Sequence, residues 1–171
     1  GSLTDIVFKA GVGKASPGVV FSRLKGLPLS VFGTAVAHAG IGLTVIGLSC
    51  VTTMQVERIT VMKPNDVVEA GGYTMRFREI AALKGPNFGE DRAVFDLTGP
   101  DGRRLGEIAS SKRIYTARAM PTTEAGIRTF GFSQLYVSIG DATESGLVVH
   151  AWWKPQVTLI WWGAVVMMFG G

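Results

Sequence analysis

The feature that most constrains this chain is a run without any charged side chain, which extends from Gly26 to Val56. Its most apolar part, residues 27–51, is long enough to cross a hydrocarbon core, which requires a helix of roughly 20 residues. A secretory signal peptide does not fit, because its apolar region is shorter and because about 26 residues precede this run. We therefore predict a transmembrane helix at residues 27–51, preceded by a loop at residues 1–26.

A second uncharged run, "PQVTLIWWGAVVMMFGG", occupies residues 155–171. Its length lies at the lower end of what a spanning helix needs. We predict a second transmembrane helix here, which is either cut short by the end of the chain or ends within the membrane. Trp152, Trp153 and Lys154 precede this run and are typical of residues that anchor a helix at the membrane interface.

The distribution of basic residues predicts the orientation in the membrane. Residues 1–26 hold four basic side chains and one acidic side chain, which gives this segment a net charge of +3. The net charge of the whole chain is +4. A short basic flank beside a first helix favours the cytoplasmic side, so residues 52–154 are expected in the periplasm. The chain has no arginine-rich helix, zinc-ligand spacing or RNA-binding motif, and we expect no nucleic-acid partner.

The region between the two apolar runs, residues 52–154, has the pattern of short β-strands. In "YTMRFRE", Tyr73, Met75 and Phe77 alternate with polar residues, which is the period of a half-buried strand. Gly71 and Gly72 indicate a hairpin, "GPDG" at residues 99–102 indicates a turn, and "SQLYVSIGDATESGLVVHAWW" reads as two strands around a polar loop. About seven or eight such strands predict a small antiparallel barrel or sandwich.

One stretch of this region has a different pattern. In "MPTTEAGIR", Met120 to Arg128, a proline stands near a possible helix start and Glu124 lies in the first turn. Glu124 and Arg128 have the favourable spacing and order of a helical ion pair. We therefore expect a short helical turn between strands at this point.

Small residues form a stripe along the first predicted helix. Their spacing alternates between four and three: Gly33, Ala37, Gly40, Thr44 and Gly47. Such a stripe allows another helix, or a flat ligand, to approach the backbone closely.

A single histidine, His38, interrupts the same helix and points about 100° away from Ala37. A neutral imidazole in lipid has a donor and an acceptor that cost free energy if they stay unpaired. Ionisable residues inside membrane helices are functional candidates for this reason. Three roles remain open from the residues alone: an interhelical hydrogen bond, a proton relay, or an axial ligand of a metal or haem. The lone cysteine, Cys50, is expected to be a small packing residue.

Several motifs follow one another in a definite order: "LPLSVFGTAVAHAGIGLTVIGL", "VERITVMKPND", "GGYTMRF", "GPNF", "SKRIYTARAMPTTEAGI", "LYVSIGD", and "WWKP" with the final "WWGAVVMMFGG". In this order they resemble the C-terminal part of the CcmF-type cytochrome c haem lyases of the multi-component cytochrome c maturation pathway, system I. The resemblance covers about residues 21 to 171. Its most specific parts are the glycine-rich helix around His38, the run from Lys112 to Ala125, and the terminal motif.

The resemblance implies that this is the C-terminal portion of a polytopic inner-membrane haem lyase, which attaches haem covalently to the CxxCH cysteines of apocytochrome c. The implied chemistry is the addition of those thiols to the vinyl groups of reduced haem. The implied partners are haem, a periplasmic haem chaperone, apocytochrome c, and the thiol-reducing and apocytochrome-binding maturation proteins. The tryptophan-rich haem-handling motif and two periplasmic histidines lie upstream in such proteins, so this chain is not expected to be catalytic alone.

The resemblance also assigns a role to His38. The resemblance implies a permanent b-type haem between two transmembrane histidines, and His38 matches the second of them. We therefore expect His38 to be an axial ligand of the iron of haem b, with the second axial ligand outside this chain. The alternative is that the chain is a non-catalytic docking module, which recruits partner proteins or the haem chaperone to the maturation complex.

Two further sets of residues have open roles. His150 is not a ligand position of the family, and we expect it to be a surface or interfacial strand histidine. An arginine set in the β-rich region either pairs with haem propionates or an acidic partner, or belongs to a solvated face. Its members are Arg103, Arg104, Arg113, Arg118 and Arg128.

Overall fold

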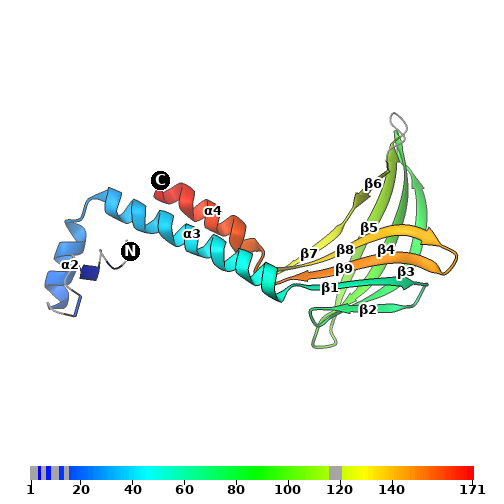
Figure 1. Ribbon diagram of the computed structural model, residues 1–171, viewed down its shortest axis with the longest axis horizontal. Helices are drawn as coiled ribbons and strands as arrows, with labels where there is room; N and C mark the ends of the chain where they lie inside the picture. Colours follow the sequence, from blue (N-terminus) through cyan, green and yellow to red (C-terminus); the bar gives the residue numbers. More distant parts are fainter. Residues whose placement is uncertain (1–3, 5–6, 9–11, 14–15, 116–120) are drawn as a thin grey trace. The chain divides into compact units, whose positions relative to one another are not determined.

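The computed structural model describes residues 4, 7–8, 12–13, 16–115 and 121–171. The chain divides into two compact units. The helical unit combines residues up to Ser49 with Val157–Gly171, and the β unit comprises Cys50–Gln156. Figure 1 shows the helices α2, α3 and α4 and the strands β1 to β9.

The helical unit contains three labelled helices: α2 (Pro17–Lys25), α3 (Leu29–Met54) and α4 (Thr158–Gly170). Pro17 begins α2, where its missing N–H removes no helical hydrogen bond. α3 has 26 residues and is long and apolar enough to cross a membrane. It extends to Met54, beyond the predicted end at residue 51, and its last residues belong to the β unit. α4 is shorter, with 13 residues, and carries no charged side chain.

The β unit is an antiparallel sandwich of two sheets (Figure 1). The strands are β1 (Val56–Met62), β2 (Val67–Ala70), β3 (Tyr73–Lys84), β4 (Phe88–Thr98), β5 (Arg104–Tyr115), β6 (Pro121–Glu124), β7 (Gly126–Phe130), β8 (Ser133–Thr143) and β9 (Gly146–Lys154). One sheet has the order β1-β9-β8-β7 and the other the order β2-β3-β4-β5-β6. The structure thus confirms an antiparallel β fold and selects the sandwich over the barrel.

The predicted turns lie where their residues indicated. Gly71 and Gly72 connect β2 to β3, and both have positive φ angles (60° and 82°) that other residues adopt with strain. The "GPDG" turn connects β4 to β5, where the Gly102 N–H donates to the carbonyl of Gly99 at 3.0 Å. The Asp101 carboxylate accepts from the N–H of Arg103 at 3.1 Å, as aspartate commonly does in turns.

The core lies between the two sheets and consists of the inward side chains of alternating positions. In β3, Met75 and Phe77 are buried, as their alternation predicted. Phe95 of β4 and Leu135 of β8 are fully buried, and the Phe77 and Phe95 rings pack 5.3 Å apart. Trp153 also packs on this core, against Tyr73, so its side chain is part of the sandwich rather than of an interfacial belt.

The predicted helical turn at Met120–Arg128 is wrong. Met120 lies outside the described residues, and the rest of the segment forms β6 and β7. β6 pairs with β5, where Thr122 lies opposite Arg113, and β7 pairs with β8. Strand pairing satisfies the backbone of this segment across two sheets, and this tertiary context overrides a local helical pattern.

Candidate functional site

The stripe of small residues on α3 is the contact surface for α4. A side-chain carbon added at Gly40 would lie 2.6 Å from the Gly163 carbonyl oxygen, and one added at Gly47 would lie 3.0 Å from the Ile160 nitrogen. On α4, a carbon added at Gly163 would lie 2.2 Å from the Thr44 hydroxyl oxygen. The sequence left open whether a helix or a flat ligand uses this stripe, and the structure shows that a helix does. The stripe and His38 are therefore separate features of α3.

His38 projects from an exposed part of α3. Its Nδ1 lies 2.8 Å from the carbonyl oxygen of Thr34, one turn earlier in the helix. A carbonyl oxygen can only accept a hydrogen bond, so Nδ1 is the donor, and in a neutral imidazole Nε2 is then the nitrogen with the lone pair. Nε2 has no hydrogen-bond partner among the residues that the structure describes. The side chain is thus oriented by one nitrogen and available for coordination through the other.

This arrangement fits the iron of a macrocycle better than a free metal ion. Within the described part of the chain, no group of three or more His, Cys, Asp or Glu side chains could hold a metal ion. A haem iron brings four equatorial ligands of its own and needs one protein side chain on each axial side. A ligating histidine also donates its other ring N–H to a carbonyl or carboxylate, as His38 does to Thr34. The local residues therefore fit a haem axial ligand.

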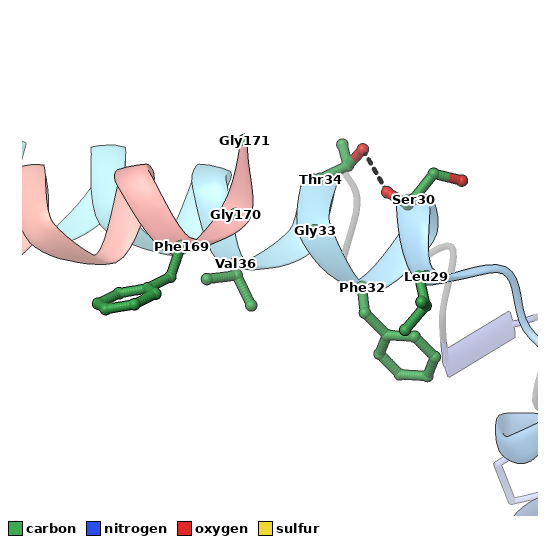
Figure 2. A pocket seen from close by; sticks show the side chains of 9 residues that line it. All are labelled: Leu29, Ser30, Phe32, Gly33, Thr34, Val36, Phe169, Gly170 and Gly171. Carbon is green, nitrogen blue, oxygen red and sulfur yellow. Dashed lines mark hydrogen bonds between the residues drawn. The ribbon is translucent and has the colours of Figure 1, made fainter.

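An open pocket of about 630 Å³ lies at one end of the helix pair (Figure 2). Phe32, Val36 and Phe169 point to one side of the helix pair in this view, whereas Thr34 lies on another side and its hydroxyl donates to the Ser30 carbonyl at 2.8 Å. His38 does not line this pocket. The pocket is lined mainly by apolar and small residues, and it offers no group for acid, base or metal chemistry.

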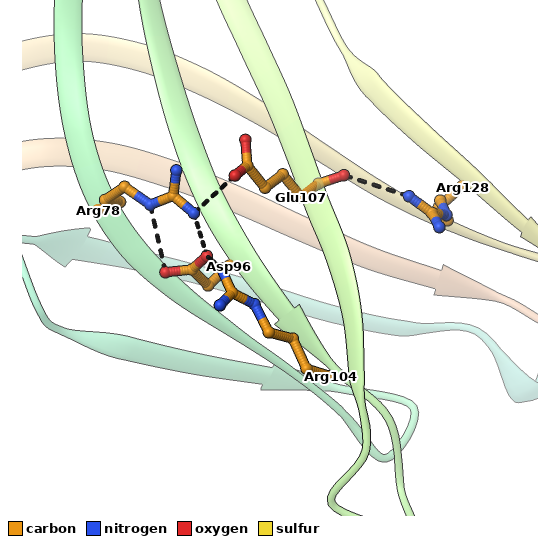
Figure 3. A network of polar contacts seen from close by, with 5 residues as sticks. All are labelled: Arg78, Asp96, Arg104, Glu107 and Arg128. Carbon is orange, nitrogen blue, oxygen red and sulfur yellow. Dashed lines mark hydrogen bonds and ion pairs between the residues drawn. The ribbon is translucent and has the colours of Figure 1, made fainter.

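The β unit carries a network of ion pairs on β3, β4 and β5 (Figure 3). Arg78 contacts Asp96 through two nitrogens and also contacts Glu107, with the latter pair 2.7 Å apart. Arg104 binds the same Asp96 carboxylate at 2.9 Å. Hydrogen bonding to Arg78 holds the pKa of Asp96 below its usual value. Arg128 completes the group by donating to the Leu105 carbonyl at 2.8 Å.

A second cluster surrounds Arg113 on β5. Its guanidinium binds Glu90 at 2.9 Å and also contacts Glu124. The same guanidinium lies over the Phe88 ring, 4.7 Å from its centroid. The hydrogen bond from Arg113 lowers the pKa of Glu90, which is buried. Glu124 is thus the partner of Arg113 across two strands, and the helical Glu124–Arg128 pair predicted from the sequence does not form.

The predicted arginine set therefore does not form one ligand-binding patch. Arg104, Arg113 and Arg128 have partners within the β unit, the side chain of Arg103 is exposed, and Arg118 lies outside the described residues. Their intramolecular pairing supports the solvated-face interpretation over binding of haem propionates.

The remaining two candidates are His150 and Cys50. His150 is a half-buried residue of β9, between Ile59 of β1 and Ser138 of β8, and its ring lies 5.4 Å from that of Trp152. This placement agrees with a surface strand histidine. Cys50 is a free, partly buried thiol in α3, as a packing residue would be.

Sequence reasoning missed two residues that organise these sites. Arg78 is the extra residue of a β-bulge, because Phe77 pairs with Phe95 while Glu79 pairs with Val94. A bulge redirects a side chain, and here the redirected guanidinium joins three strands. Thr34 orients His38 through its backbone carbonyl. The spacing of four residues between Thr34 and His38 was a usable signal, whereas nothing in the local sequence indicates the bulge.

Three comparisons with known proteins agree with this architecture. A family model described as the CcmF C-terminal β-sandwich matches residues 53–155. The cytochrome c-type biogenesis protein CycK of Rhizobium meliloti is 53% identical over 100% of this chain, which covers 25% of that relative. CcmF of Pseudomonas aeruginosa is 33% identical over 89% of this chain and 23% of its own length.

A solved structure of a cytochrome c haem lyase, CcmF, has the same fold, with a TM-score of 0.70 over 99% of this chain and 33% of that chain. Its sequence is 14% identical, so this likeness concerns the fold alone. The chain spans about a quarter of the length of the curated relatives described above.

Proposed function

Because this chain belongs to the CcmF C-terminal β-sandwich family, we propose that it is the C-terminal portion of a haem lyase, which attaches haem covalently to apocytochrome c during cytochrome c maturation. The family match over residues 53–155 and the relatives named for cytochrome c biogenesis support this function. On this proposal the partners are haem, apocytochrome c, a periplasmic haem chaperone, and the thiol-reducing and apocytochrome-binding maturation proteins.

The same proposal includes the arrangement in the membrane. Residues 1–26 form a cytoplasmic loop, residues 27–51 and 155–171 are transmembrane segments of the bacterial inner membrane, and residues 52–154 form a periplasmic domain. The length and apolar character of α3 support the first span. The basic residues that precede it favour the cytoplasmic side for that flank.

Within the haem lyase, we propose that His38 is one axial ligand of a resident haem b. The observation that supports this assignment is the hydrogen bond from Nδ1 to the Thr34 carbonyl, which leaves Nε2 without a hydrogen-bond partner among the described residues. The bound haem would supply the electron transfer that keeps the substrate haem reduced. His38 holds the iron, and the Thr34 carbonyl orients the imidazole and increases its basicity. The second axial ligand lies outside this chain.

The test is an absorption spectrum of the full-length membrane protein. His38→Ala should abolish the low-spin b-type spectrum, because it removes the one nitrogen that this helix offers to the iron. His150→Ala is the matched control, since His150 is the other histidine of the chain and should leave the spectrum unchanged. An unchanged haem content and spectrum in His38→Ala would contradict the assignment of His38 as a ligand.

A docking role is the second candidate, and the outer face of the four-stranded sheet favours it. Ile59, Val61 and Ile127 lie on this face, and each exposes about half of its surface or more, at 61%, 46% and 53%. Ile59 and Val61 lie two residues apart on the edge strand β1, and Ile127 lies on β7 at the opposite edge of the same sheet. Exposed apolar residues that gather on one face are typical of interaction surfaces. Replacing Ile59 and Ile127 by Asp should weaken co-purification of maturation partners while the haem spectrum stays intact. Loss of haem with partners still bound would count against docking at this face.

A further inference from the structure

α3 contains four glycines, and the helix pair explains three of them. Gly33, Gly40 and Gly47 all face α4, where an added side-chain carbon would lie 2.6–3.0 Å from an α4 atom. Gly42 differs from them, because an added carbon would meet no atom within 4 Å among the residues that the structure describes. Glycine within a helix destabilises it relative to alanine. Packing against α4 therefore does not account for the glycine at residue 42.

The position of Gly42 relative to His38 offers a reason. The two residues are four apart in α3, so they lie on the same helix face one turn from each other. Ile41 and Val45 border Gly42 on this side of the helix and are exposed by 48% and 55%. The surface beside the imidazole is thus a bare stretch of backbone with an apolar border. A flat, largely apolar ring can lie closer to such a surface than to any side chain.

We propose that Gly42 is the steric determinant of the haem site at His38. Its missing side chain keeps the helix surface next to the imidazole clear, so that a flat metal macrocycle held by Nε2 can lie against the α3 backbone. This inference rests on the proposed function, because it requires His38 to hold a haem. It adds that the site selects its ligand by shape. The space beside Gly42 accommodates a planar macrocycle, and a larger residue at position 42 would exclude it.

The experiment uses the full-length membrane protein with Gly42→Ala and Gly42→Leu, and it measures haem per polypeptide and the b-type absorption spectrum. Gly42→Leu should weaken haem retention roughly tenfold or more, on the scale of overpacking a close contact, and Gly42→Ala should have a smaller effect. Ala39→Leu is the matched control, because it places a leucine at an exposed position of α3 that points about 100° away from His38. This control should keep its full haem content.

A second arm separates a haem contact from a contact with another helix. Gly42→Leu is combined with His38→Ala, and the thermal stability of the polypeptide is compared with that of His38→Ala alone. The proposal expects no loss of stability, since the site then holds no haem for the leucine to displace and leucine favours the helix more than glycine does. If Gly42→Leu lowers stability equally with and without His38, the glycine serves helix packing and the proposal is overturned.

The two levels of the proposal fail in different ways. Full haem retention in Gly42→Leu, together with haem loss in His38→Ala, would overturn the role of Gly42 and leave the ligand role of His38 standing. An intact b-type spectrum in His38→Ala would overturn both. Graded loss from Gly42→Ala to Gly42→Leu, with Ala39→Leu unaffected, supports the proposal.

Discussion

The helical unit and the β unit distribute their apolar side chains in opposite ways. On α3 the buried positions are Ala35, Gly40 and Gly47, while large apolar residues such as Val45 remain exposed. In the sandwich, large residues such as Phe95 are fully buried, and the described charged side chains other than Glu90 are exposed or half-buried. Close backbone contact through small residues is typical of helices in lipid, whereas burial of large apolar side chains is the response to water. The two units thus fit two different solvents.

The polar side chains follow the same contrast. Several acidic and basic residues of the sandwich form ion-pair clusters around Arg78 and Arg113. α3 has no acidic or basic residue, and its histidine is held by its own backbone. His38 therefore differs from the charged residues of the sandwich, because its imidazole is paired through Nδ1 alone and is surrounded by apolar residues of α3.

The largest effect is expected from Phe95→Ala in the core of the sandwich. Removing a fully buried phenylalanine should lower the free energy of unfolding of the β unit by about 3–5 kcal/mol, through lost burial and a new cavity. Thermal denaturation followed by near-UV circular dichroism measures this change. Ile59→Ala, at a residue that is 61% exposed, is the control and should change stability little. Equal losses in both variants would contradict the inside–outside assignment of the sheets.

A smaller effect is expected from Gly40→Leu in the helical unit. The added side chain would meet the Gly163 carbonyl of α4, so overpacking should cost roughly 1–3 kcal/mol. Ala39→Leu places the same side chain on the exposed surface of α3 and should be tolerated. Loss of helicity on heating, followed by far-UV circular dichroism of the solubilised protein, measures the difference. If the two variants melt alike, glycine contacts do not hold the two helices together.

The smallest expected effect is a loss of stability of the sandwich at acidic pH. Glu90 and Asp96 have lowered pKa values because Arg113 and Arg78, respectively, donate hydrogen bonds to them. A carboxyl group whose pKa is lower in the folded chain stabilises the fold above its unfolded pKa, and this stabilisation is lost as the pH falls through the folded value. The melting temperature of the sandwich should therefore be steady near neutral pH and fall below about pH 4.

Glu90→Gln tests the cause of this acid dependence, because glutamine cannot titrate and the fall with pH should become shallower. α3 and α4 contain no carboxylate, so their melting should not follow the same profile. An unchanged acid profile in Glu90→Gln would show that the Glu90–Arg113 pair does not contribute to it.

Many strands and turns of the β unit could be predicted from local sequence pattern. The exceptions have a common cause. The alternation around Met75 and Phe77 predicted a strand, since a half-buried sheet position repeats every second residue. Residues 121–124 resembled a helix start, yet they pair with β5 as a strand. Arg78 looked like any outward residue of β3 until the bulge directed it to Asp96. Both exceptions depend on strand partners that are distant in sequence.

Local pattern along the chain was enough to predict an apolar helix of membrane-spanning length with a single histidine, His38, followed by a β domain with glycine turns. These properties depend on hydropathy, periodicity and backbone freedom, which act over a few residues. The tertiary structure decided that α4 occupies the small-residue stripe and that Gly42 lies outside it, on the side of His38. It also decided which carboxylate each arginine binds, because such contacts depend on register and packing between segments that no local pattern encodes.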